Sequence, residues 1–292
     1  MPTKKLVQFH PAAPLSSEKT ALLAILVNFI VTVIRFFFGY WSGSTALIGD
    51  SWHHLKDVAG SASVYTAIKL AKIQNESFPY GLYKIEDLVA LAMSILIFGV
   101  GYELLEEVIL SPTQEVQHVS YTIIAIIICL LIKFFFGRYE YHVAKQTHSP
   151  GLRADARHFL ADVWGSLVIL IGLFGEFINL HLEFFTTLII VFIIWLNAGK
   201  TAIQAISSLM DIALPLKERK EIKEFLLTYT QVKDIMAIYS RKAGSKIFIE
   251  LDLQLDALLN REAAEKLCHS LEKDLYNKYP QLARATIHYH AF

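Results

Sequence analysis

Six stretches of the chain are apolar over a length close to the roughly 20 residues that a helix needs to cross a bilayer. They lie at about residues 20–40, 46–70, 88–108, 119–136, 152–178 and 184–206. The second and fifth stretches are less apolar than the others because they carry several ionisable residues. The pattern predicts six membrane-spanning helices, two of which bring polar chemistry into the bilayer.

Beyond residue 211 the long apolar runs give way to short segments in which apolar and polar residues alternate, as in a water-soluble domain. It predicts a helix at 217–227, strands at 235–240 and 247–255, a helix from the N-cap Asn260 to about Lys278, and a last strand at 285–290. The fold class is therefore an all-α six-helix transmembrane bundle followed by a small α+β domain. The predicted domains are an N-terminal segment (1–19), a transmembrane domain (20–211) and a C-terminal domain (212–292).

Composition agrees with a membrane protein. Hydrophobic residues make up 54% of the chain and charged residues 18%, and the mean hydropathy is +0.42. These values exclude a disordered chain and a basic nucleic-acid-binding arm, so no nucleic-acid partner is expected. Two cysteines are too few for a disulfide framework or a thiolate metal site.

The basic residues predict the orientation of the spans. Alternate connections hold twelve of them, namely Lys4, Lys5, Lys19, Lys69, Lys72, Lys84, Lys133, Arg138, Lys145, Arg153, Arg157 and Lys200, and the other connections hold none. Cytoplasmic loops retain Lys and Arg, so both termini are expected in the cytoplasm. Arg35 is expected to extend toward the outer membrane surface from the end of the first span.

A polar motif occurs once in each of the two less apolar spans. Residues 50–61 and 155–166 both read D-x-x-H-x-x-x-D-V-x-G-S. On a helix, residues four apart lie one turn apart on one face, so His53 lies above Asp57 and His158 above Asp162. Gly60 and Gly165 continue these faces and are expected to let the two helices approach closely.

If these faces of the two helices meet, His53, Asp57, His158 and Asp162 would surround a metal ion with two nitrogen and two oxygen ligands. Tetrahedral N/O coordination suits Zn²⁺, and a site without thiolates is compatible with release of the ion. The alternative is a structural set of hydrogen bonds or ion pairs between helices. Asp50 and Asp155 are expected to support the ligands rather than bind the ion. His54 is expected to pack or contact solvent, and the role of Lys56 is left open.

These features resemble the cation diffusion facilitator family. The likeness covers nearly the whole chain and includes the two H-x-x-x-D motifs, the Asp50 lead-in, the sequence Pro79-Tyr80-Gly81 ending in Lys84 and Glu86, and the sequence Leu209-Met210-Asp211. The resemblance implies a homodimeric exporter that moves divalent metal out of the cytosol in exchange for protons. It also implies that His53 favours Zn²⁺ over Mn²⁺ or Fe²⁺, that Lys84 and Asp211 form a charge interlock, and that the C-terminal domain is ferredoxin-like or metallochaperone-like. Some relatives bind zinc through histidines in the loop between spans two and three, and residues 75–84 contain none, so no metal is expected there.

Proton coupling also follows from the ligand types. Protons and metal compete for the same imidazoles and carboxylates, which would couple the two fluxes without a separate proton site. The protein is therefore expected to be a secondary active transporter in contact with lipid, and neither an enzyme nor a holder of a resident cofactor. Export of Fe²⁺, Mn²⁺, Co²⁺ or Cd²⁺, a metal-sensing subunit that does not transport, and a membrane metalloenzyme are the alternatives. Few cysteines and compact loops suggest a bacterial inner membrane.

The C-terminal domain offers a possible second metal site. Asp252 lies on the long central strand, and His288 and His290 lie two apart on one face of the last strand. Such a site would make Zn²⁺ a regulator as well as the cargo. Solvated strand residues or contacts between two copies of the chain explain the same pattern.

Overall fold

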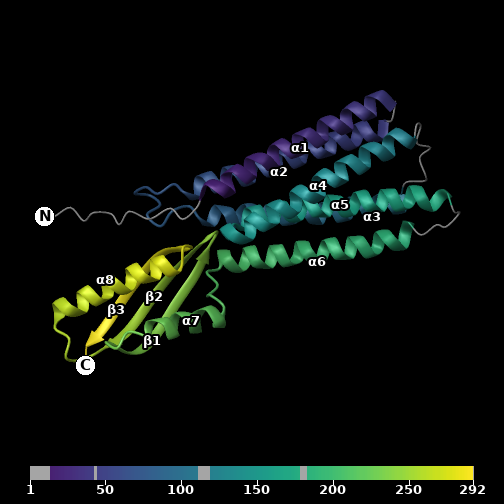
Figure 1. Ribbon diagram of the computed structural model, residues 1–292. Coiled ribbons are helices and arrows are strands. Elements are labelled where there is room, and N and C mark those ends of the chain that lie inside the picture. The colour runs from purple at the N-terminus through teal and green to yellow at the C-terminus, as the bar shows by residue number, and fades with distance from the viewer. Residues whose placement is uncertain (1–13, 43–44, 111–118, 178–182, 292) are drawn as a thin grey trace. The chain divides into compact units, whose positions relative to one another are not determined.

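The computed structural model describes residues 14–42, 45–110, 119–177 and 183–291. These residues form two compact units, a helical unit over Leu15–Ile206 and a C-terminal unit from Ser207 onward. The long helices of the first unit are α1 (Pro14–Ser42), α2 (Thr45–Ala71), α3 (Lys84–Leu110), α4 (Val119–Thr147), α5 (Pro150–Phe177) and α6 (Glu183–Leu209) (Figure 1). The second unit contains α7 (Leu216–Leu226), β1 (Val232–Ala243), β2 (Lys246–Leu255), α8 (Arg261–Lys278) and β3 (Leu282–Ala291).

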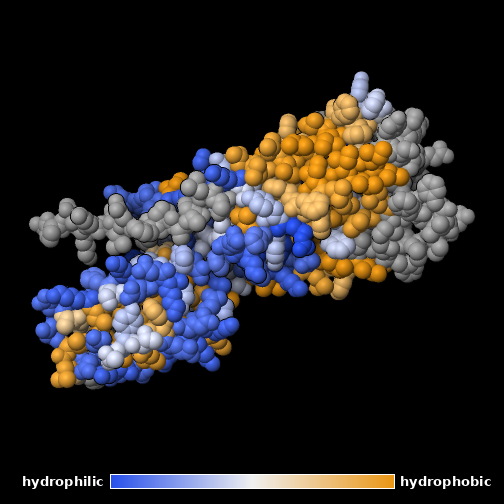
Figure 2. All heavy atoms as spheres, in the orientation of Figure 1, coloured by the Kyte–Doolittle hydropathy of each residue, from blue (hydrophilic) through white to orange (hydrophobic). Residues whose placement is uncertain are grey.

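The helical unit has apolar residues on its outside and polar residues within. Large hydrophobic side chains such as Phe29 and Phe37 of α1 are exposed, and Figure 2 shows hydrophobic atoms spread over the outer surface of the helices. Asn28, Lys133 and Asp155 are almost completely buried. This distribution suits a protein surrounded by lipid with a polar interior.

Two helices in the described ranges are long and apolar enough to cross a membrane by themselves. They cover Ser17–Phe38 in α1 and Lys84–Glu106 in α3.

A tight connection joins α4 to α5 and aligns the two helices. His148 adopts a left-handed backbone conformation (φ 55°), and Ser149 caps α5 by accepting a hydrogen bond from the Leu152 amide on its Oγ (3.4 Å). The two helices pack against each other as an antiparallel pair, so residues equally far from the turn lie opposite one another. α4 extends to Thr147, beyond the predicted end of the apolar span near residue 136, because its last turns are polar but still helical.

The C-terminal unit is a three-stranded sheet with two helices. The strand order is β1-β2-β3, with β1 antiparallel and β3 parallel to the central β2. Alternate residues of β2, including Leu251 and Leu253, are buried in a core with Leu271 and Leu275 of α8. The predicted α-β-β-α-β order is confirmed, and Asn260 caps α8 by accepting a hydrogen bond from the Ala263 amide (2.8 Å).

β1 is longer than the predicted 235–240. Its hairpin with β2 closes at Gly244, whose φ of 57° permits a two-residue turn, so the ladder continues to the pair Ala243 and Lys246. The sequence pattern underestimates this strand because charged residues lie near both of its ends, Lys233 and Asp234 at the start and Arg241 and Lys242 before the last residue.

Candidate metal-transport site

Buried polar residues of α2 and α5 meet inside the helical unit. His158 Nε2 lies 3.0 Å from Asp57 Oδ1, and His158 Nδ1 lies 3.6 Å from Asp162 Oδ1. All three side chains are at most 8% exposed. The structure thus brings together one residue of the first motif and both predicted ligands of the second.

His54, which follows His53 in the first motif, also belongs to this cluster. His54 is 5% exposed, and its Nδ1 lies 2.6 Å from Asp57 Oδ2. The expectation that His54 packs against apolar groups or contacts solvent is therefore wrong. Residues three apart and four apart both lie on the same side of a helix, so His54 faces Asp57 as readily as His53 can. The side chains of His53, Asp50 and Lys56 lie outside the described residues.

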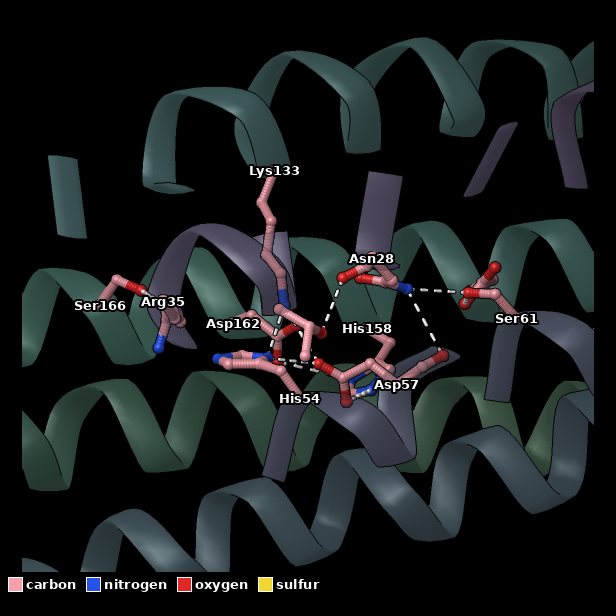
Figure 3. A network of polar contacts seen from close by, with 11 residues as sticks. Asn28, Arg35, His54, Asp57, Ser61, Lys133, His158, Asp162 and Ser166 are labelled. Carbon is pink, nitrogen blue, oxygen red and sulfur yellow. Dashed lines mark hydrogen bonds and ion pairs between the residues drawn. The ribbon is translucent and has the colours of Figure 1, made fainter. Parts of the chain in front are cut away.

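Lys133 of α4 occupies the centre of the cluster (Figure 3). Its ammonium lies 2.5 Å from Asp162 Oδ2, 3.1 Å from Asp57 Oδ2 and 3.0 Å from His54 Nδ1. The side chain is 1% exposed. The placement of Lys133 among the basic residues of the cytoplasmic connections is therefore wrong. The sequence contained the signal, because Lys133 lies within the apolar run at 119–136.

This arrangement provides converging donor atoms for a cation. Ligand atoms of His54, Asp57 and Asp162 lie within 4.8 Å of one another. The Lys133 ammonium contacts both carboxylates and compensates one of their two negative charges, which lowers the cost of burying them in a medium of low dielectric constant. Imidazole nitrogens and carboxylate oxygens are donors that Zn²⁺ and similar divalent ions accept.

A second polar chain links α1, α2 and α5 next to this cluster. Ser61 Oγ accepts a hydrogen bond from Asn28 Nδ2 (2.9 Å) and donates one to Asp155 Oδ1 (3.0 Å), and Asn28 Nδ2 also lies 3.4 Å from the Asp57 carbonyl oxygen (Figure 3). Asp155, expected to support the metal ligands, thus accepts its hydrogen bond from Ser61. Its role as a support for the ligands stays a prediction.

The outer part of the helical unit departs from expectation at Arg35. This residue is 4% exposed, and its Nη2 lies 3.4 Å from Ser166 Oγ of α5. Arg35 therefore lies inside the bundle instead of extending to the membrane surface. Its guanidinium is a second buried positive charge, and it lies on the side of His54, Asp57 and Asp162 opposite to Ser61 (Figure 3).

The motif glycines face α3. A side-chain carbon at Gly60 would lie 3.3 Å from Met93 Sδ, and one at Gly165 would lie 3.6 Å from Leu104 Cδ2. They were expected to bring α2 and α5 together, but they instead make room for the bulkier side chains of α3.

The predicted interlock between Lys84 and Asp211 joins residues of two different units and stays a prediction. Within its own unit, Asp211 Oδ1 lies 3.3 Å from Arg241 Nη1. Asp211 also has a left-handed backbone (φ 60°) and ends α6, because the Asp211 amide donates to the Ser208 carbonyl and the Ile212 amide to the Ser207 carbonyl. This pair of bonds is a Schellman cap.

The candidate residues of the C-terminal unit share one face of the sheet. Asp252 and His288 are register partners on neighbouring strands, and His290 lies two residues further along β3. In the part of the chain that the structure describes, three converging metal-ligand atoms occur only at His54, Asp57 and Asp162. The metal site in the C-terminal unit stays a prediction.

Family models match both units. Residues 21–210 match the model of the cation efflux transmembrane domain, and residues 214–291 match that of the cytoplasmic domain of cation efflux proteins.

Similar proteins come from a plant and from bacteria. Metal tolerance protein C1 of Arabidopsis thaliana is 26% identical over 93% of this chain, which spans 62% of the plant protein. The cation-efflux pump FieF of Pectobacterium atrosepticum is 28% identical, with 89% of this chain and 88% of the pump covered. Among solved structures, CzrB, studied as a zinc transporter, is 32% identical over 26% of this chain and 95% of that chain, with a TM-score of 0.25.

Proposed function

Because this chain belongs to the cation efflux family, with a transmembrane domain followed by a cytoplasmic domain, we propose that it exports a divalent metal ion, chiefly Zn²⁺, in exchange for protons. The buried cluster of Asp57, His158, Asp162 and His54 around Lys133 is the observation that supports this function most directly. The metal is the cargo of this cluster. His53 is proposed to join Asp57, His158 and Asp162 as a ligand, with His54 as a further nitrogen donor.

Lys133 gives the cluster a second state. The ammonium holds the two carboxylates together when no metal is bound, and a divalent ion has to displace it to reach the same oxygens. Competition with this tethered cation lowers metal affinity, and moderate affinity favours release on the far side of the membrane. Lys133 therefore acts as an internal counter-ion of the transport cycle.

Coupling to protons follows from the same donor atoms. Metal binding requires imidazoles that are neutral and carboxylates that are ionised, so protons and metal compete for the cluster. A higher proton concentration on the outer side then drives the metal off. Cytoplasmic termini and a homodimer complete the proposal, with the C-terminal unit as the contact between copies.

Reconstituted vesicles test this function. The purified protein is expected to accumulate Zn²⁺ in response to a pH gradient, and Asp57→Asn and Asp162→Asn are each expected to lower the rate by about a hundredfold, as removal of a site-forming charge does. Glu106→Gln, at an exposed acid near the end of α3, serves as the matched control and should transport normally. Failure of the gradient to drive any of Zn²⁺, Cd²⁺, Co²⁺, Fe²⁺ or Mn²⁺ would refute metal/proton exchange, and the ranking of these ions identifies the cargo.

A further inference from the structure

Two further acids lie buried between α4 and α5, separate from the metal cluster. Glu140 and Asp155 are both 0% exposed. Each lies seven residues from a member of the cluster on the same helix, Glu140 from Lys133 and Asp155 from Asp162. Seven residues are two helical turns, about 10 Å along the axis, so these acids form a second polar level on the same faces.

The α4–α5 connection explains why the two acids meet. The turn centres near His148, and antiparallel packing places residues equally far from it opposite each other. Lys133 therefore lies opposite Asp162, as their 2.5 Å contact shows, and Glu140 lies opposite Asp155. Both side chains are completely buried in this α4–α5 interface, so their carboxyl groups lie beside each other.

Three of the four carboxyl oxygens of Glu140 and Asp155 accept no hydrogen bond from any described residue. Among the residues that the structure describes, none donates a hydrogen bond to either carboxyl oxygen of Glu140, and Asp155 accepts one on Oδ1 alone, from Ser61. Two ionised carboxylates in contact, buried and without donors, repel each other strongly, whereas one proton turns the contact into a hydrogen bond.

Among the described residues, the group that donates a hydrogen bond to the pair is the uncharged Ser61, and the charged groups lie farther away. Asp57 of α2 and His158 of α5 act on Asp155 from a distance, and α1 and α2 contribute the uncharged Asn28 and Ser61. Other charges close to the turn have their own partners. Glu86 of α3 accepts a hydrogen bond from Ser149 (2.6 Å), and Arg157 of α5 donates to Thr201 of α6.

We propose that Glu140 and Asp155 form a proton-binding pair, distinct from the metal cluster, in which the two carboxyl groups share one proton. A divalent ion fits the pair less well, because the Ser61 hydroxyl is already engaged with Asn28 and Asp155 and leaves two carboxylates as the ligands. The Asn28–Ser61 chain joins the pair to the backbone of Asp57, which gives metal binding a physical route to the proton. Use of this proton in transport rests on the proposed function, but its presence does not.

Infrared spectroscopy of the full-length protein in lipid detects the proton without any transport. The wild type is expected to show the C=O stretching band of a buried protonated carboxylic acid at neutral pH, and Glu140→Gln and Asp155→Asn should each remove or shift it. Glu106→Gln, which alters an exposed acid, should leave the band unchanged. Absence of the band in the wild type, or its persistence in both variants, would overturn the pair.

Vesicle measurements then test the role of the proton. Glu140→Gln is expected to keep Zn²⁺ binding by calorimetry but to exchange about one proton fewer per metal ion than the wild type. An unchanged proton-to-metal ratio would refute the coupling role. A second Zn²⁺ per chain in the wild type that disappears in Glu140→Gln would instead make the pair a metal site and refute the proton assignment.

Discussion

At the scale of single residues, Lys133 has the largest influence on the candidate site. It is fully buried and contacts two carboxylates and an imidazole from two other helices. A long flexible side chain carrying one charge can enter such a cluster when metal is absent and leave it when metal arrives.

Lys133→Met should destabilise the metal-free protein by about 3 kcal/mol, because it leaves two buried carboxylates without their cation. The same change should raise Zn²⁺ affinity by about tenfold or more, since metal no longer competes with the ammonium. Thermal unfolding in detergent, with and without Zn²⁺, measures both effects. Lys145→Met, at an exposed lysine on the same helix, is the control. Equal stabilisation of the wild type and Lys133→Met by Zn²⁺ would contradict competition.

At the scale of elements, the ends of helices determine which residues meet. The short α4–α5 turn, with His148 in a left-handed conformation and Ser149 as a cap, aligns two pairs of polar residues two turns apart. One residue inserted within α5 between Asp155 and Asp162 would rotate one of these acids by about 100° relative to the other and remove one pair from the shared interface. The Schellman cap at Asp211 ends α6 in the same local way.

Asp211 provides a test of two roles. If its main role is the left-handed cap, Asp211→Gly should be neutral and Asp211→Ala should cost about 1 kcal/mol, because glycine and aspartate tolerate the left-handed conformation better than alanine does. A charge interlock with Lys84 predicts that both variants are equally damaging. Thermal unfolding and Zn²⁺ uptake of the two variants, beside Lys84→Met, distinguish these roles.

At the scale of the whole molecule, the chain forms two units that have separate cores and different surfaces. The helical unit has an apolar exterior and a polar interior, whereas the C-terminal unit is built around the leucines of β2 and α8. The family match assigns the first to the transmembrane domain and the second to the cytoplasmic domain.

Residues 212–292 are expected to fold by themselves and to unfold cooperatively, because their core draws on every element of the unit. Circular dichroism during denaturant titration measures this, and a broad transition without a baseline would contradict it.

Calorimetric titration of the same fragment with Zn²⁺ tests the predicted site at Asp252, His288 and His290. No uptake would remove that site, and uptake that is lost in His288→Ala would support it.

Sequence patterning predicts much of this molecule because its signals are periodic and local. Apolar runs of bilayer length and the alternation of β2 depend on neighbouring residues, and the N-cap at Asn260 involves a residue three positions away. The polar residues in the second and fifth spans also stand out, because ionisable groups are costly in a bilayer.

By itself, the sequence determined the class of the protein, the order of its elements and the helices that carry the cluster. Only the tertiary structure decided that His54 faces Asp57, that Lys133 enters the cluster and that Glu140 meets Asp155. The physical reason is that a helix presents a broad face, on which residues three and four apart are both acceptable. The partner of a long side chain, moreover, depends on the register between helices, which the turn and the packing set.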